Sequence, residues 1–209
     1  MNKNSSLKLY EKFFVDRDFE RLDLFKLLCE KYGVESALYP GSYVHITPSF
    51  VFPITVYVDS DKKAKKFFND PEIYNFIEKH KIYPENADVT FHAMDYKNDL
   101  GMKEQSFDLL ISQYAGFVSQ YCKRYLKIGG VLLVNNSHGD ASMASIDSDY
   151  EFIAAVNRSQ GKHRLMEKNL DRYFIPKSTA NISKEYIEKI QKGIGYTKSA
   201  SAYIFKRIK

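Results

Sequence analysis

Short apolar runs rich in β-branched and aromatic residues alternate with helical patterns along most of this chain. The runs lie at residues 34–39, 56–59, 88–94, 107–112 and 131–135, and turn-forming residues precede each of them. Strands that are apolar along their whole length are buried on both faces, as in a parallel sheet covered by helices. The alternation therefore predicts an α/β fold in three layers, with a mostly parallel sheet and helices on both faces.

The intervening segments have helical spacing and helix-terminal signals. Apolar residues from Phe19 to Tyr32 recur at helical intervals, and Gly33 is placed to end that helix. Further helices are expected at 62–68 with Asp61 as the capping residue, at 71–80, at 117–126, at 147–158 and from a cap at Ser183. Residues 172–175 are expected to form a strand or an extended lid, and residues 202–208 a final strand at a sheet edge.

The 209 residues are enough for one globular unit, which we divide into a helical segment, 1–33, and an α/β domain, 34–209. No apolar run is long enough to span a membrane, and no apolar stretch typical of a signal peptide follows the first six residues. We therefore expect a cytoplasmic protein with no membrane partner. The two cysteines and the histidines lack the spacing of metal ligands, so we expect no bound metal.

The formal net charge is +5, and the excess lysines are spread along the chain. This charge is compatible with a nucleic-acid partner but does not indicate one.

A turn and an acid in the stretch 36–61 indicate a ligand of the nucleotide type. The first apolar run breaks at Pro40-Gly41, and the second ends at Asp59. A glycine allows the backbone to approach a ligand closely, and a carboxylate at the end of the next strand can accept hydrogen bonds from ribose hydroxyls.

Three segments carry a resemblance to the class I S-adenosylmethionine-dependent methyltransferases. The segment 125–134, Tyr-Leu-Lys-Ile-Gly-Gly-Val-Leu-Leu-Val, is similar to the entry into that family's fifth strand. Segments 107–112 and 56–61 are similar to its fourth and second strands. The resemblance implies a Rossmann-like fold, S-adenosylmethionine as cofactor and methyl transfer to an acceptor. The glycine loop departs from the family's pattern, because Gly41 alone stands where the family usually has three glycines.

By this resemblance, the cofactor would lie at the carboxyl ends of the strands. Asp59 would hold the ribose hydroxyls, and Asp95 would face the adenine amino group. The other expected cofactor-binding residues are Tyr39, Gly41 and Ser112.

The loops after the fourth and fifth strands leave the same sheet edge and are expected to bind the acceptor. Tyr114 could stack on a substrate, and His138 with Asp140 could supply a general base. The region 140–195 is expected to cover the pocket. The acceptor itself is not readable from the sequence and could be a small molecule, a protein or RNA.

Two other functions remain open from the sequence. The single glycine is also consistent with a methyltransferase-like scaffold that has lost its cofactor and binds a partner. As a minor alternative, Asp61 and Lys63 together with Glu35 could form part of a metal-dependent nuclease site.

Overall fold

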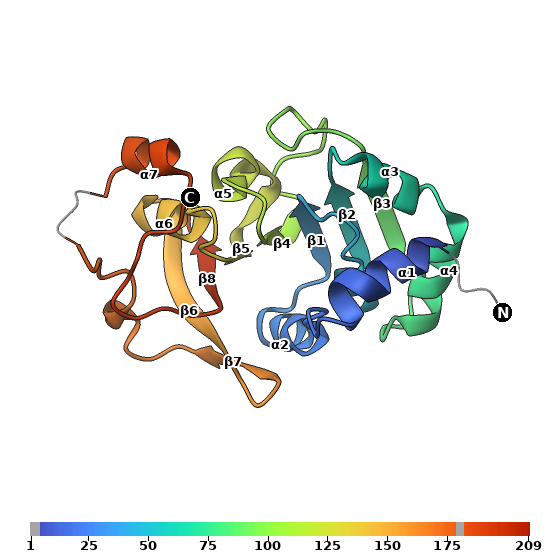
Figure 1. Cartoon of the computed structure of the whole chain (residues 1–209), viewed down its shortest axis with the longest axis horizontal. Coiled ribbons are helices and arrows are strands. Elements are labelled where there is room, and N and C mark those ends of the chain that lie inside the picture. Colours follow the sequence, from blue (N-terminus) through green and yellow to red (C-terminus); the bar gives the residue numbers. More distant parts are fainter. Residues whose placement is uncertain (1–4, 179–181) are drawn as a thin grey trace.

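A computed structural model describes residues 5–178 and 182–209 of the chain. Its centre is a single sheet of eight strands in the order β3-β2-β1-β4-β5-β8-β6-β7 (Figure 1). The first five strands in the chain pair in parallel. They are β1 (Ser36–Pro40), β2 (Ile54–Val58), β3 (Asp88–His92), β4 (Phe107–Ser112) and β5 (Leu126–Val134). The parallel part of the fold is thus confirmed at the five predicted positions.

The other three strands are antiparallel, so the sheet as a whole is mixed. They are β6 (Tyr150–Ser159), β7 (Lys162–Met166) and β8 (Ala202–Arg207). The helix predicted at 147–158 is wrong, because this segment pairs with β7 and β8 as a strand. The edge position predicted for 202–208 is also wrong, since β8 lies between β5 and β6 and is buried from Ala202 to Phe205.

The N-terminal segment folds against the parallel half of the sheet. It consists of α1 (Ser5–Tyr10), a π-helical turn (Glu11–Val15) and α2 (Leu22–Tyr32). Gly33 ends α2 with a φ of 63°, as predicted. The Tyr10 hydroxyl lies 2.9 Å from the Thr47 hydroxyl, which ties α1 to the short 3-10 helix Thr47–Phe50 that precedes β2.

Two predicted helices have the expected bounds, α3 (Lys62–Phe68) and α4 (Pro71–His80). The helix predicted at 117–126 is shorter, because α5 (Val118–Tyr121) passes into a 3-10 turn, Lys123–Tyr125, and β5 begins at Leu126. The remaining helices are α6 (Asp140–Ile146) and α7 (Lys184–Ile190), and Ser183 caps α7 as predicted.

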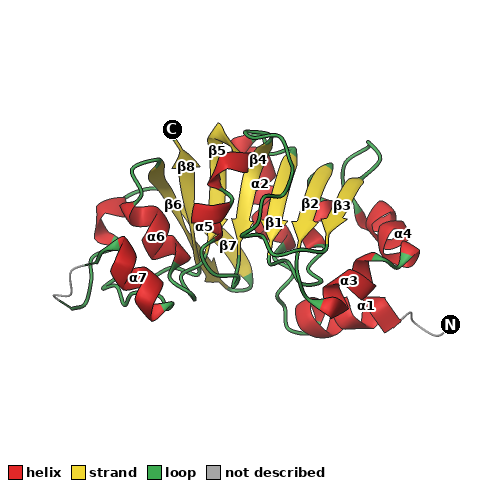
Figure 2. Ribbon diagram, turned by 90° about the horizontal axis from the view of Figure 1, so that it is seen from above, coloured by secondary structure: helices red, strands yellow, loops and turns green. Residues whose placement is uncertain are grey.

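Helices cover both faces of the sheet, which confirms the three-layer prediction (Figure 2). Alternate residues of β4 show the separation of the two faces. Leu109 and Ile111 belong to the cluster that contains α2 and α4, whereas Leu110 belongs to the cluster that contains α5 and α6.

The first part of the C-terminal region extends the sheet and does not form a lid. Residues 140–166 add α6 and the strands β6 and β7 to the molecule. The segment predicted as a strand or lid at 172–175 follows a 3-10 turn, Leu170–Arg172, and buries Tyr173 against Phe152 of β6. None of the helices in the described part of the chain is both long and apolar enough to cross a membrane.

Candidate functional site

The order of the strands reverses between β1 and β4, and ligands of open α/β sheets bind at the carboxyl ends of the strands beside such a point. Gly41 follows β1 with a φ of 65°, and its N–H donates to Val58 O at 2.7 Å. The Asp59 carboxylate accepts from the Tyr43 N–H at 2.7 Å and from the Asp61 N–H at 2.8 Å. The predicted glycine and acid are therefore adjacent, and Asp59 holds the loop that follows β1.

The Tyr39 side chain is buried in the core and is 3% exposed. Its hydroxyl lies 3.1 Å from His45 Nδ1, and His45 Nε2 lies 3.0 Å from Glu20 O, an acceptor. Nε2 therefore carries the proton, and the Tyr39 hydroxyl donates to Nδ1. Burial, together with the Arg21 guanidinium, lowers the pKa of His45 to about 3, so the ring is neutral at pH 7. The hydroxyl of Tyr39, a residue predicted to bind the cofactor, is thus engaged within the protein.

The space over Gly41 is filled by the loop that follows β4. A Cβ atom on Gly41 would lie 2.2 Å from Ala115 Cβ, which is far inside van der Waals contact. The Tyr96 hydroxyl, from the loop after β3, donates to Ala115 O and ties the two loops together. Gly41 therefore permits a close approach of the chain to itself, in the place where a cofactor was expected.

Asp95 and Ser112 are engaged within the protein. The Asp95 carboxylate lies in an exposed turn and accepts from the Lys97 N–H at 2.9 Å. The Ser112 hydroxyl, at the end of β4, donates to the Asp140 carboxylate in the interior.

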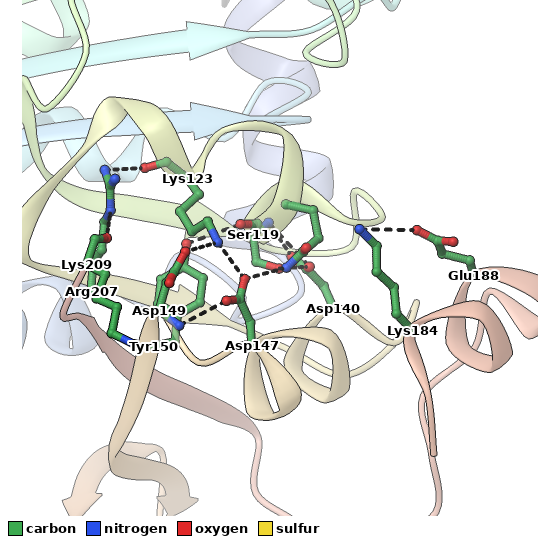
Figure 3. A network of polar contacts seen from close by, with 11 residues as sticks. Ser119, Lys123, Asp140, Asp147, Asp149, Tyr150, Lys184, Glu188, Arg207 and Lys209 are labelled. Carbon is green, nitrogen blue, oxygen red and sulfur yellow. Dashed lines mark hydrogen bonds and ion pairs between the residues drawn. The ribbon is translucent and has the colours of Figure 1, made fainter. Parts of the chain in front are cut away.

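Asp140 is 2% exposed and joins β4, α5 and α6, and Figure 3 shows its contact with Ser119 of α5. The hydroxyl and the N–H of Ser119 also donate to its carboxylate. Burial raises the pKa of Asp140 to about 6, although the hydrogen bonds from Ser112 and Ser119 oppose this rise. The prediction that Asp140 assists His138 does not fit, because its carboxylate is enclosed and fully used.

A second polar cluster beside Asp140 joins the 3-10 turn after α5 to the segment between α6 and β6 (Figure 3). The Lys123 ammonium lies 2.8 Å from Asp147 and 2.6 Å from Asp149. These groups fix the chain where it turns from α6 into β6, and they have a structural role.

Two predicted site residues, Tyr114 and His138, do border one pocket of about 490 Å³. The pocket lies between the loop after β3, the loop after β4 with α5, the loop after β5, and α7. Sequence reasoning missed most of its lining, because the lining residues follow three different strands, β3, β4 and β5, and also come from α7. The lining residues not predicted are Tyr96, Lys97, Ala115, Gly116, Phe117, Tyr121, Glu188 and Gln191.

The nuclease arrangement is wrong. Glu35 precedes β1, whereas Asp61 follows β2, and these strands pair in parallel. The two residues therefore lie at opposite ends of the paired strands. Five strand residues at about 3.3 Å each separate these ends by about 16 Å. Asp61 instead caps α3. Among the described residues there is no group of three acids, histidines or cysteines that could hold a metal ion.

Comparisons with known proteins identify the fold. No known family profile matches the sequence, and none of the curated proteins is similar to it. Solved structures are similar at low sequence identity.

A S-adenosylmethionine-dependent methyltransferase from Thermotoga maritima, described as a possible histamine N-methyltransferase, has a TM-score of 0.52 at 13% identity. The match covers 97% of this chain and 96% of that one. A putative enzyme of the same class from Methanococcus maripaludis has a TM-score of 0.50 at 14% identity, with 100% and 97% covered. An O-methyltransferase from Bacillus cereus, solved in complex with SAH, has a TM-score of 0.51 at 10% identity, with 79% and 90% covered. The chain thus has the fold of the class I methyltransferases, as its sequence segments predicted.

Proposed function

We propose that this protein is a S-adenosylmethionine-dependent methyltransferase that binds its cofactor at the carboxyl ends of β1 and β2. The observation that carries the proposal is the contact between the Asp59 carboxylate and the Tyr43 N–H, which places an acid beside the Gly41 turn at the switch point. The similar folds of S-adenosylmethionine-dependent methyltransferases support it, since two of them match nearly the whole chain.

The hydrogen-bond acceptors at this edge of the sheet suit an adenosyl group. Each Asp59 oxygen accepts one N–H and has a lone pair left for a ribose hydroxyl. Asp95 is exposed and would face the adenine amino group. The bound cofactor would supply an electrophilic methyl group, and the protein would contribute mainly the position of the acceptor. The room for the cofactor is lacking while Ala115 lies over Gly41, so binding requires loop 113–117 to move.

The proposal is tested by calorimetry with S-adenosylmethionine and with its demethylated product. We expect Asp59→Asn and Asp59→Ala to weaken binding by about 1 to 3 kcal/mol, the range for a lost hydrogen bond to a charged group. Asp88→Ala, an exposed acid on the edge strand β3, is the matched control and should bind as the wild type does. Thermal unfolding of each variant separates a lost contact from a lost fold. Unchanged affinity in both Asp59 variants would remove Asp59 from the site.

A second candidate is a partner-binding protein that uses the methyltransferase fold without a cofactor. The position of Ala115 Cβ over Gly41 favours it, because the chain itself occupies the crevice. Ala115→Gly distinguishes the two functions by removing the atom that fills this space. Binding of S-adenosylmethionine that is tighter in Ala115→Gly than in the wild type supports the enzyme. Absence of binding at millimolar concentration in both proteins supports the scaffold.

A further inference from the structure

We propose that the pocket formed by loop 113–117, the loop after β5 and α7 binds a planar aromatic molecule that carries an ionisable hydroxyl group. We refer to it as the aromatic pocket, and its lining residues are those given above. Its role as the acceptor site rests on the proposed function, whereas the binding of the aromatic molecule does not. Its volume of about 490 Å³ is in the range of small-molecule sites.

The walls of the aromatic pocket are mostly aromatic. Four rings border it, those of Tyr96, Tyr114, Phe117 and Tyr121. Two of them are well exposed, Tyr114 at 51% and Tyr121 at 46%. The rings of Tyr96 and Tyr121 are 6.1 Å apart and inclined at 68°, an edge-to-face pair in the pocket wall. Aromatic faces and edges prefer another planar π-system over a saturated ring of the same size.

His138 lines this pocket, and its hydrogen bonds within the protein determine which ring nitrogen is an acceptor. The Ser137 hydroxyl donates to Asn135 Oδ1 at 2.8 Å and lies 2.9 Å from His138 Nδ1. Since the hydroxyl has only one proton, Nδ1 must carry the hydrogen of that second contact. Nε2 is then the unprotonated nitrogen, and no residue in the described part of the chain bonds to it. A hydroxyl group of a ligand can donate to Nε2, which is also placed to accept its proton.

Two buried amides hold this arrangement in place. Asn135, at the end of β5, is 5% exposed, and its Nδ2 lies 3.5 Å from Oε1 of Gln113. Gln113, at the end of β4, is 4% exposed and also accepts from the Arg21 guanidinium. The orientation of the Asn135 amide fixes which atom faces Ser137. Asn135 and Ser137 are therefore positioning residues for His138.

One charge of the pocket lining favours the ionised form of a hydroxyl group. The Lys97 ammonium has no ion-pair partner within residues 5–178 and 182–209, and it lies 5.9 Å from the centre of the Tyr121 ring. Glu188, also in the lining, lies 4.0 Å from the Lys184 ammonium on the exposed side of α7 (Figure 3). The Lys97 ammonium is thus a positive charge at the pocket wall, and a nearby positive charge favours ionisation of a hydroxyl group.

The binding test uses 2-naphthol and its saturated analogue decahydro-2-naphthol, titrated into the full chain without S-adenosylmethionine and followed by NMR. We expect 2-naphthol to bind about tenfold more tightly than decahydro-2-naphthol. This difference corresponds to the upper range of the free energy of a preferred aromatic contact. We also expect 2-naphthol to shift the ring signals of Tyr121 and His138. Equal affinities, or shifts confined to other parts of the protein, would overturn the proposal. Because no cofactor is added, the result is independent of whether the protein transfers methyl groups.

Variants locate the binding. Tyr121→Leu should weaken 2-naphthol binding by about tenfold. Tyr186→Leu, which removes an exposed ring of α7 outside the pocket, is the matched control and should have no effect. His138→Ala should abolish the preference for 2-naphthol over naphthalene while retaining the binding of both. An effect of Tyr186→Leu equal to that of Tyr121→Leu would overturn the assignment.

The tautomer of His138 tests the positioning residues separately. Long-range ¹H–¹⁵N spectra of the free protein should show the hydrogen on Nδ1 in the wild type and in Ser137→Thr, which keeps the hydroxyl. Ser137→Ala should shift the population toward the Nε2–H tautomer, with the fold retained. A wild-type protein with its hydrogen on Nε2 would contradict the proposed relay.

Discussion

Asp140 shows how burial changes the role of a single residue. Its carboxylate accepts from Ser112 and Ser119 in the interior, and burial raises its pKa from 3.8 to about 6. The folded state thus binds the proton more tightly than the unfolded state does. The contribution of Asp140 to stability is therefore largest below pH 4 and falls as the pH rises to about 6.

This predicts that Asp140→Asn gains stability relative to the wild type as the pH rises from 4 to 7. Two pKa units correspond to a relative change on the order of 3 kcal/mol. Urea unfolding at several pH values measures the difference between the two proteins, in which contributions from all other titrating groups cancel. Parallel stability curves would show that the carboxyl titrates normally in the folded protein.

A close contact and the backbone conformation explain why residue 41 is a glycine. We predict that Gly41→Ala destabilises the protein by about 2 kcal/mol or more, because the new Cβ meets Ala115 and the φ of 65° disfavours a side chain. The double variant with Ala115→Gly should recover part of this loss, since it removes the colliding Cβ. Urea unfolding of the four proteins gives the coupling free energy. Strict additivity would show that loop 113–117 does not lie over Gly41 in solution.

At the scale of elements, α3 depends on the residue that precedes it, Asp61. Asp61 accepts from the Lys63 N–H at 2.6 Å and from the Ala64 N–H at 3.2 Å, and the helix that follows has only seven residues. We predict that Asp61→Ala lowers the free energy of unfolding by about 1 kcal/mol and that Asp61→Ser retains most of it. Chemical denaturation measures both. A loss in Asp61→Ser as large as that in Asp61→Ala would argue against a capping role.

Helices whose ends are marked by local sequence signals were predicted correctly. The segment whose structure depends on pairing with other strands was not. Asp61, Pro71 and Gly33 mark helix ends through their own backbone and side-chain contacts. The segment 150–159 has a short apolar run, which suits a buried helix and a buried strand equally. It forms β6 because β8 and β7 offer hydrogen-bond partners on both of its sides.

At the scale of the whole molecule, β8 closes the sheet between its two halves. It pairs with β5 on one side and with β6 on the other, whereas β3 and β7 are the edge strands. We predict that the amides of Tyr203 to Phe205 are among the slowest to exchange with deuterium, and that those of β3 exchange faster. Hydrogen exchange followed by NMR tests this. Exchange in β8 as fast as in β3 would mean that β8 is an edge strand, as its sequence suggested.

The candidate site was predictable only in part. The positions of Gly41 and Asp59 followed from the ends of two strands, and the structure places them side by side. The enclosure of Asp140 and the aromatic pocket did not follow, because their residues come from loops distant in the sequence. Tyr96 and Tyr121, for example, are separated by a whole strand, yet their rings are 6.1 Å apart.

The sequence by itself determined the five parallel strands, the helices α3 and α4 and the resemblance to the class I methyltransferases, because apolar runs and helix caps act over a few residues. Only the tertiary structure decided that β6 is a strand, that β8 lies inside the sheet and that Ala115 covers Gly41. Each of these depends on contacts between distant segments. The free energy of each contact depends on which residues the folded chain brings together. A short stretch of sequence does not specify those partners.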